Sequence, residues 1–99
     1  MNNRNKRSDP NCELYRAMMV LRSPEEFYSF FLDLCTQPEL NAMEQRYEVA
    51  KMLYAGLIYN DILSKTSASS ATISRVNRSL NNGEGAYEMV FERVKKEQI

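Results

Sequence analysis

Apolar residues recur at steps of three and four along most of the chain, which is the period of an amphipathic α-helix. Six segments show this pattern or are bounded by helix signals. They cover about residues 12–22, 24–35, 36–56, 57–66, 71–80 and 85–98. No segment alternates apolar and polar residues for long enough to form a strand. The sequence therefore predicts an all-α fold with about six helices.

Capping residues mark where several of these helices begin and end. Ser23 and Pro24 precede two acidic residues, so we expect serine at the N-cap and proline in the first turn. Thr36 and Glu39 have the spacing of a capping box for the long third helix. Gly83, after two asparagines, is expected to end the fifth helix in a left-handed cap.

The second and third predicted helices are apolar around more than one face. In the second, the apolar residues are Phe27, Phe30, Phe31, Leu32 and Leu34. A helix that is apolar on several sides must be covered on several sides. A chain of 99 residues could hardly cover both helices by itself, so we predict a homodimer. The alternative is a compact monomer with a central core helix.

Length and composition set further limits. The 99 residues contain 43% apolar and 26% charged residues, typical of one folded domain, which we place at residues 12–98. The longest uncharged runs are shorter than the ~20 residues that a membrane span requires. Residues 1–9 lack the apolar core of a signal peptide. We expect a cytoplasmic protein in which residues 1–11 form a flexible basic arm.

The residue types present argue against catalysis. The chain has no histidine, and its two cysteines, Cys12 and Cys35, lie too far apart for the usual zinc spacings. We therefore expect no enzyme, no metal site and no cofactor. A small enzyme using Glu44 and Glu48 is the weakest alternative, because two acids four residues apart usually form a solvated helix face.

Thirteen basic and thirteen acidic residues cancel overall, but they are unevenly distributed. Residues 57–82 contain three basic residues against one acidic residue, and residues 1–9 show the same excess. Residues 23–54 contain six acidic residues against two basic ones. A basic segment beside an acidic one keeps nucleic acid among the candidate partners.

The basic segment has the layout of a helix-turn-helix, at about residues 58–80. A short helix, a turn of three or four small polar residues and a second helix follow one another. On a helical wheel of the predicted helix at residues 71–80, Val76, Asn77 and Leu80 lie near Ile73. The opposite side contains Ala71, Ser74, Arg75 and Arg78. This separation suits a recognition helix in the major groove, although a solvated surface helix is the alternative.

The residues expected to contact double-stranded DNA follow from this geometry. Base edges would be read by Ser70, Ala71, Ser74 and Arg78, with Asn60 and Lys65 nearer the phosphates. Ser69 and Thr72 are also expected to lie at the DNA, because they belong to the start of this helix. That end has no acidic residue, and the helix dipole there favours an anion.

Several motifs resemble the Trp repressor superfamily. The run from Ala68 to Leu80 resembles its recognition helix, and residues 39–50 resemble its long third helix. The motifs "LCT" at 34–36, "QRYEVAKML" at 45–53, "ATISRVNRSL" at 71–80 and "AYEM" at 86–89 are most similar to the Trp-repressor-like YerC/YecD family. The resemblance extends over about residues 12–96.

This resemblance implies an intertwined homodimer with two helix-turn-helix segments and a role as a transcriptional regulator, expected to be a repressor. The alternative is a helical protein-interaction module that does not bind DNA.

The resemblance also implies a small-ligand site. Arg46 and Arg75 match the two arginines that enclose tryptophan in the Trp repressor, while Thr36 and Ser79 match other residues of its pocket. Val76 stands where the repressor has glycine, so we expect tryptophan to fit poorly and the effector to be absent or different. Alternatively, the two arginines pair with acids or contact phosphate; the acids considered are Glu39, Glu44 and Glu48.

Overall fold

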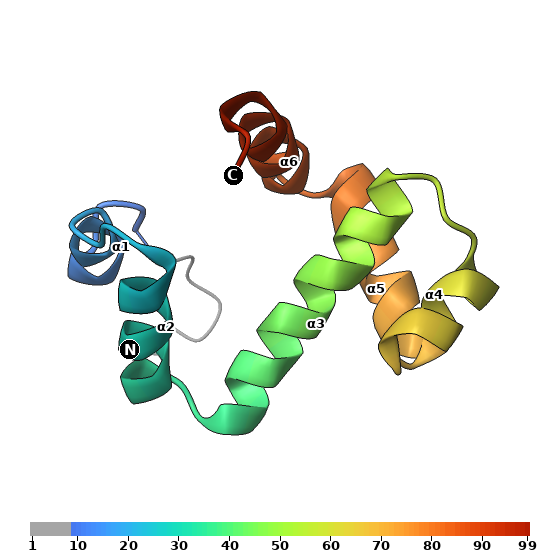
Figure 1. Ribbon diagram of the computed structural model, residues 1–99, viewed down its shortest axis with the longest axis horizontal. Helices are drawn as coiled ribbons and strands as arrows, with labels where there is room; N and C mark the ends of the chain where they lie inside the picture. Colours follow the sequence, from blue (N-terminus) through green and yellow to red (C-terminus); the bar gives the residue numbers. More distant parts are fainter. Residues whose placement is uncertain (1–8) are drawn as a thin grey trace, which may run out of the picture. The chain divides into compact units, whose positions relative to one another are not determined.

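A computed structural model describes residues 9–99, and within that range the chain forms six α-helices and no strand (Figure 1). The all-α prediction is confirmed. The helices are α1 (Glu13–Met18), α2 (Pro24–Leu34), α3 (Gln37–Tyr54), α4 (Tyr59–Thr66), α5 (Ser70–Asn82) and α6 (Ala86–Glu97). Two compact units divide at Gln37 and Pro38. None of the helices within residues 9–99 is long and apolar enough to cross a membrane.

The described part of the first unit begins with a turn at Asp9. The carbonyl oxygen of Asp9 accepts a 3.0 Å hydrogen bond from the Cys12 amide, and the Asp9 carboxylate accepts one of 2.8 Å from the Asn11 amide. Aspartate followed by proline is a favoured start for such a turn. Residues 9–11 therefore form a turn that leads into α1, and the flexibility of this end of the chain stays a prediction. The rest of the predicted arm, residues 1–8, lies outside the described residues.

Helix α1 ends at Met18, four residues earlier than predicted. The amides of Met19, Val20 and Leu21 each donate to the carbonyl three residues before them, so the chain tightens into a short 3₁₀-like turn. The helix could not continue through Ser23, because this residue precedes a proline and is extended, with a φ of −151° and a ψ of 159°.

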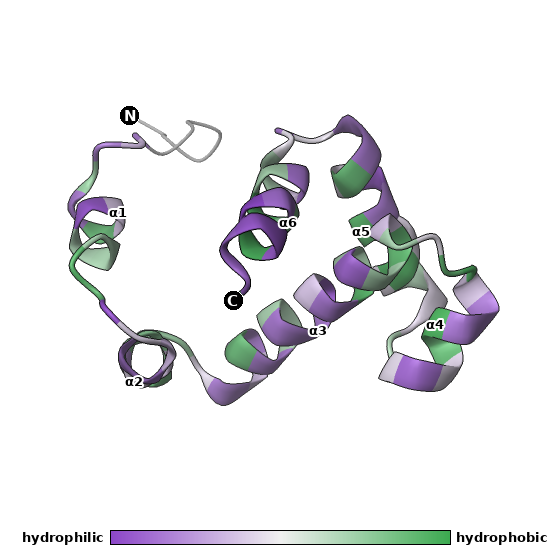
Figure 2. Cartoon of the chain, turned by 45° about the horizontal axis from the view of Figure 1, so that its top comes forward, coloured by the Kyte–Doolittle hydropathy of each residue, from purple (hydrophilic) through white to green (hydrophobic). Residues whose placement is uncertain are grey.

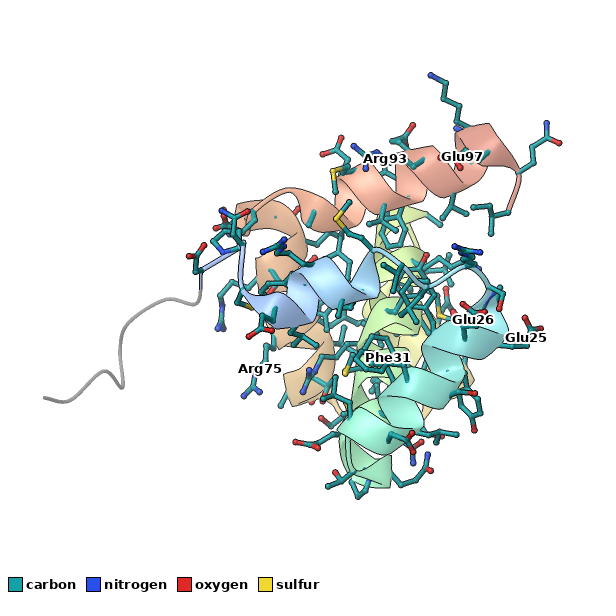
Figure 3. The ribbon with its side chains drawn as sticks, turned by 90° about the vertical axis from the view of Figure 1, so that its left-hand side faces the viewer. Glu25, Glu26, Phe31, Arg75, Arg93 and Glu97 are labelled. Carbon is teal, nitrogen blue, oxygen red and sulfur yellow. The ribbon has the colours of Figure 1, made fainter. Side chains whose placement is uncertain are left out.

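Helix α2 begins as the sequence predicted. The Ser23 hydroxyl accepts a 3.1 Å hydrogen bond from the Glu26 amide, and Pro24 lies in the first turn. The Glu26 carboxylate accepts one of 2.8 Å from the Arg22 amide. Figure 3 shows Glu25 and Glu26 at this end of α2, where the positive end of the helix dipole favours acidic side chains.

Helix α3 ends in a Schellman motif. Gly56 has φ +93°, and its amide donates to the Leu53 carbonyl while the Leu57 amide donates to the Met52 carbonyl. Glycine adopts this left-handed conformation without a steric penalty. Because the chain changes direction at Gly56, α4 begins at Tyr59 and not at Leu57 as predicted.

The core of the second unit joins α3 to the three helices that follow it (Figure 1). Its buried residues are Val49, Ala50, Ile62, Ala68, Ile73, Val76 and Phe91. Burying a side chain of the size of valine or isoleucine contributes about 1.5–3 kcal/mol. Figure 2 shows that hydrophobic residues also occur along the visible face of α3, and Met43, Tyr47 and Tyr54 are exposed.

The end of α5 differs from the prediction. Gly83 is not left-handed, because its φ is −87° and its ψ is −149°. Its lack of a side chain matters for another reason: a Cβ there would collide with the backbone carbonyl of Ser79. The left-handed glycine is Gly85, with φ +80°, at the start of α6.

Candidate nucleic-acid interface

Residues 59–82 form a helix-turn-helix, named here the helix-turn-helix segment. Helix α4 is followed by a turn of three residues, 67–69, and by α5. The turn has the length that the sequence predicted. Ile62 of α4 and Ile73 of α5 are both fully buried in the core of the second unit. The two helices are therefore held to α3 by their apolar sides, which leaves their other sides free.

The turn is fixed by hydrogen bonds at Thr66. Its hydroxyl donates to the Ile62 carbonyl at 2.7 Å and accepts from the Ala68 amide at 3.2 Å. Ser67 between them adopts the left-handed conformation with φ +62°. Ala68 is 3% exposed. A single threonine therefore joins the end of α4 to a buried residue of the turn.

Ser69 caps α5. Its hydroxyl oxygen accepts a 3.1 Å hydrogen bond from the Thr72 amide, and the hydroxyl also donates to the Thr72 side chain at 3.0 Å. The first turn of α5 contains no acidic residue. The end therefore presents a positive helix dipole, and its first amides have no acceptor within the helix, a combination that favours a phosphate.

The two sides of α5 are separated as the helical wheel predicted. Ile73 and Val76 are buried, while Asn77 and Leu80 are half-buried. The opposite side is exposed and includes Ser70, Ala71, Ser74, Arg75 and Arg78. Figure 3 shows the Arg75 side chain extending away from the helix. The exposed side offers short side chains and two guanidinium groups to a partner.

Helix α4 places the remaining predicted DNA contacts at its two ends. Asn60 lies in its first turn and Lys65 in its last turn, and both are exposed. Lys65 therefore adds a positive charge close to the turn and to the N-terminus of α5. Asp61 is the one acidic residue in residues 57–82.

The predicted effector residues are spread over three elements. Arg75 and Ser79 are exposed on α5, four residues apart and so on one side, and Arg46 is exposed on α3. Thr36 precedes α3 in the first unit and is also exposed. Two cavities of the second unit, of about 410 Å³ and 290 Å³, are lined by other residues. An effector pocket formed by these four residues stays a prediction, as does the alternative that Arg46 and Arg75 pair with acids or contact phosphate.

Val76 lies on the buried side of α5, as the helical wheel predicted. Its side chain is 2% exposed and belongs to the core of the second unit. The expectation that tryptophan fits poorly beside Arg75 stays a prediction.

Two tertiary hydrogen bonds were not foreseen. The Gln45 side-chain amide of α3 donates to the Thr66 carbonyl at 3.3 Å, and the Tyr54 hydroxyl of α3 donates to the Glu92 carboxylate of α6 at 2.5 Å. The partners are 21 and 38 residues apart. No local pattern in the sequence indicates such pairs.

Comparisons with known proteins agree with the fold. Residues 12–95 match the family model described as Trp repressor protein. YerC of Bacillus subtilis, itself uncharacterised, is 50% identical over 84 residues, which are 85% of this chain and 81% of YerC. A TrpR-like protein of Eubacterium eligens has a crystal structure with TM-score 0.81 and 52% identity, covering 84% of this chain and 86% of that one. A candidate Trp repressor of Staphylococcus aureus gives TM-score 0.85 and 43% identity, covering 96% and 95%.

Proposed function

Because the chain belongs to the Trp repressor family, we propose that it is a sequence-specific DNA-binding transcriptional regulator, a repressor, that acts as a homodimer in the cytoplasm. The observation that carries this proposal is the separation of α5 into a buried apolar side and an exposed side with two arginines. A recognition helix needs both sides: one holds it to the protein and the other enters the major groove.

On this proposal, α5 lies in the major groove with Ser70, Ala71 and Ser74 close to the bases. Their short side chains allow the backbone to approach the groove floor. Arg78 donates two hydrogen bonds to a guanine, which distinguishes that base from the others. Lys65 and Asn60 contact phosphates, and the capped start of α5 at Ser69 and Thr72 faces a further phosphate.

A second copy of the chain is proposed to cover the first two helices. Neither α1 nor α2 buries any residue within the single chain. Phe27, Tyr28, Leu32 and Leu34 of α2 are 36 to 53% exposed. An isolated helix of 11 residues is marginal in water, so a helix with this much uncovered apolar surface needs a partner to persist. Two copies present two helix-turn-helix segments to half-sites about one helical turn apart.

An effector is proposed to bind between copies, where Arg46, Arg75, Ser79 and Thr36 from different elements could meet. Two guanidinium planes can stack on an aromatic ring, and one of them can bind a carboxylate through two hydrogen bonds. Calorimetry of the unmodified protein with tryptophan, with and without DNA, tests whether this ligand fills the role. Tryptophan that binds without changing DNA affinity would not be an effector.

A salt titration of DNA binding tests the regulator proposal. We expect the logarithm of the affinity for duplex DNA to fall linearly with the logarithm of salt concentration, because phosphate neutralisation releases counterions. The variant Arg78→Ala should bind DNA more weakly, whereas Arg93→Ala, which removes the same charge from an exposed position on α6, should change binding far less. Absence of DNA binding by the unmodified protein at low salt would favour a protein-interaction module instead.

A further inference from the structure

One polar side chain of α3 reaches the end of the first helix of the helix-turn-helix segment. The Gln45 amide group donates a 3.3 Å hydrogen bond to the Thr66 carbonyl, and the contact is partly buried. Only the NH₂ of a glutamine can donate to a carbonyl oxygen, so the bond fixes the orientation of the amide. Gln45 therefore joins the long helix to the residue at which α4 ends.

The acceptor is a carbonyl that its own helix cannot satisfy. The last turn of an α-helix leaves its carbonyl oxygens without intrahelical donors. At Thr66 the chain is about to leave α4 through the left-handed Ser67, which has φ +62°. The Gln45 amide supplies a donor where the backbone changes direction.

Thr66 is thereby held on both its main chain and its side chain. Gln45 bonds its carbonyl, while its hydroxyl bonds the Ile62 carbonyl and the Ala68 amide. Ala68 is buried, and the next residue, Ser69, caps α5. The direction in which α5 starts is thus set by a short chain of contacts that begins at Gln45.

Apolar packing holds α4 and α5 close to α3, but it does not by itself fix the orientation of α5. Directional contacts are therefore needed at the turn. Ile62, Ile73 and Val76 hold α4 and α5 against α3 by burial, which is not directional. A hydrogen bond weakens steeply as its angle departs from linearity. A small rotation about the turn would displace the exposed side of α5 relative to the groove that it enters.

We propose that Gln45 is a positioning residue, whose hydrogen bond to Thr66 fixes the turn and thereby aims α5 for specific DNA reading. This inference rests on the proposed function. Gln45 contacts no DNA on this view, and it acts through Thr66.

Two substitutions and one control isolate the hydrogen bond. Gln45→Met keeps the length of the side chain and removes the donor, while Gln45→Glu keeps the shape and replaces the donor with an acceptor. Glu44→Gln is the control, because Glu44 lines the cavity of about 410 Å³ between α3 and α4, called here the cleft, together with Gln45. It changes the polarity of the cleft and leaves the bond intact.

The first measurement is amide hydrogen exchange, which needs no DNA. In Gln45→Met, protection should fall at the Ala68 amide, while the amides of Val49 and Ala50 in α3 keep theirs. The protonated carboxyl of Gln45→Glu can again donate, so lowering the pH below its ordinary pKa of about 4.3 should restore protection at Ala68 in that variant only. Glu44, Glu48 and Lys65 line the cleft beside residue 45 in both variants, so any effect of pH that does not involve residue 45 should also appear in Gln45→Met.

The second measurement compares a duplex selected by the unmodified protein from a random pool with bulk genomic DNA. Gln45→Met should bind the selected duplex about three- to tenfold more weakly, the range of one hydrogen bond, and bulk DNA almost unchanged. Glu44→Gln should keep the ratio of the two affinities.

Four results would overturn the inference. Unchanged protection at Ala68 in Gln45→Met would show that the bond does not fix the turn. Equal losses of both DNA affinities together with a lower melting temperature would show a merely structural role. An unmodified protein that binds neither DNA would end the proposed function along with the inference, whereas DNA binding that Gln45→Met leaves intact would end the inference alone.

Discussion

The Tyr54 hydroxyl donates a 2.5 Å hydrogen bond to the Glu92 carboxylate and so joins α3 to α6. The ring of Tyr54 also packs against Phe91, with the ring centroids 5.1 Å apart. Tyr47 and Tyr87 contact the same phenylalanine, at 5.4 and 5.9 Å. An aromatic cluster and a hydrogen bond together hold the last helix against the long one.

This pair predicts that Tyr54 loses its proton at a higher pH than an ordinary tyrosine. The hydrogen bond to Glu92, then partial desolvation, then the charges of Glu92 and Glu88 raise the pKa of Tyr54 from 10.0 to about 12. A raised pKa means that the folded state holds the proton more tightly. The stabilisation is therefore complete below pH 10 and is lost as the pH rises towards 12.

Phenolate absorbance measures this directly. The difference between titrations of the unmodified protein and Tyr54→Phe should show one group near pH 12, and Glu92→Gln should move that group back towards 10. A difference curve centred at 10 in the unmodified protein would contradict the pairing in solution.

The uncovered apolar surface of α2 predicts an obligate dimer. Sedimentation at low micromolar concentration should show a single dimeric species. Leu32→Asp should dissociate or unfold it, because a charge would be placed where the partner is expected, whereas Asp33→Asn at the neighbouring exposed position should not. A stable folded monomer of the unmodified chain would refute this prediction.

Arg78 is expected to determine sequence preference. Arg78→Ala should cost ~1–3 kcal/mol of specific binding per helix-turn-helix segment, the contribution of a good bidentate contact to guanine. The measurement is affinity for the selected duplex and for versions of it with single base changes. An affinity and preference identical to those of the unmodified protein would mean that Arg78 faces solvent in the complex.

Lys65 is expected to contribute affinity without preference. Lys65→Ala should weaken binding to all duplexes alike and reduce the slope of log affinity against log salt by about 1, as for one lost phosphate contact. Lys96→Ala on α6 is the matched control, since that lysine is also exposed but lies outside the helix-turn-helix segment. A change in sequence preference with Lys65→Ala would assign it to a base instead.

Val76 should matter for stability. Val76→Gly removes a buried side chain and places glycine inside α5, which together should lower the free energy of unfolding by roughly 3 kcal/mol. Ser74→Gly, at an exposed position of the same helix, should show only the smaller cost of the glycine backbone. Denaturant unfolding of both variants gives the difference. Equal losses would show that Val76 is not packed in the core.

The sequence by itself determined the helices and the sides that they bury. Period and capping are local properties, so the Ser23 cap, the three-residue turn and the two sides of α5 could all be predicted from neighbouring residues. The composition of the exposed side of α5 likewise followed from spacing alone.

Tertiary structure decided the features that depend on distant residues or on backbone angles. The bonds from Gln45 to Thr66 and from Tyr54 to Glu92 exist only because folding brings separate helices together. The sequence also could not tell that Gly83 is required by a neighbouring carbonyl. Helical periodicity indicates which side of a helix is apolar, but what covers that side depends on packing in three dimensions.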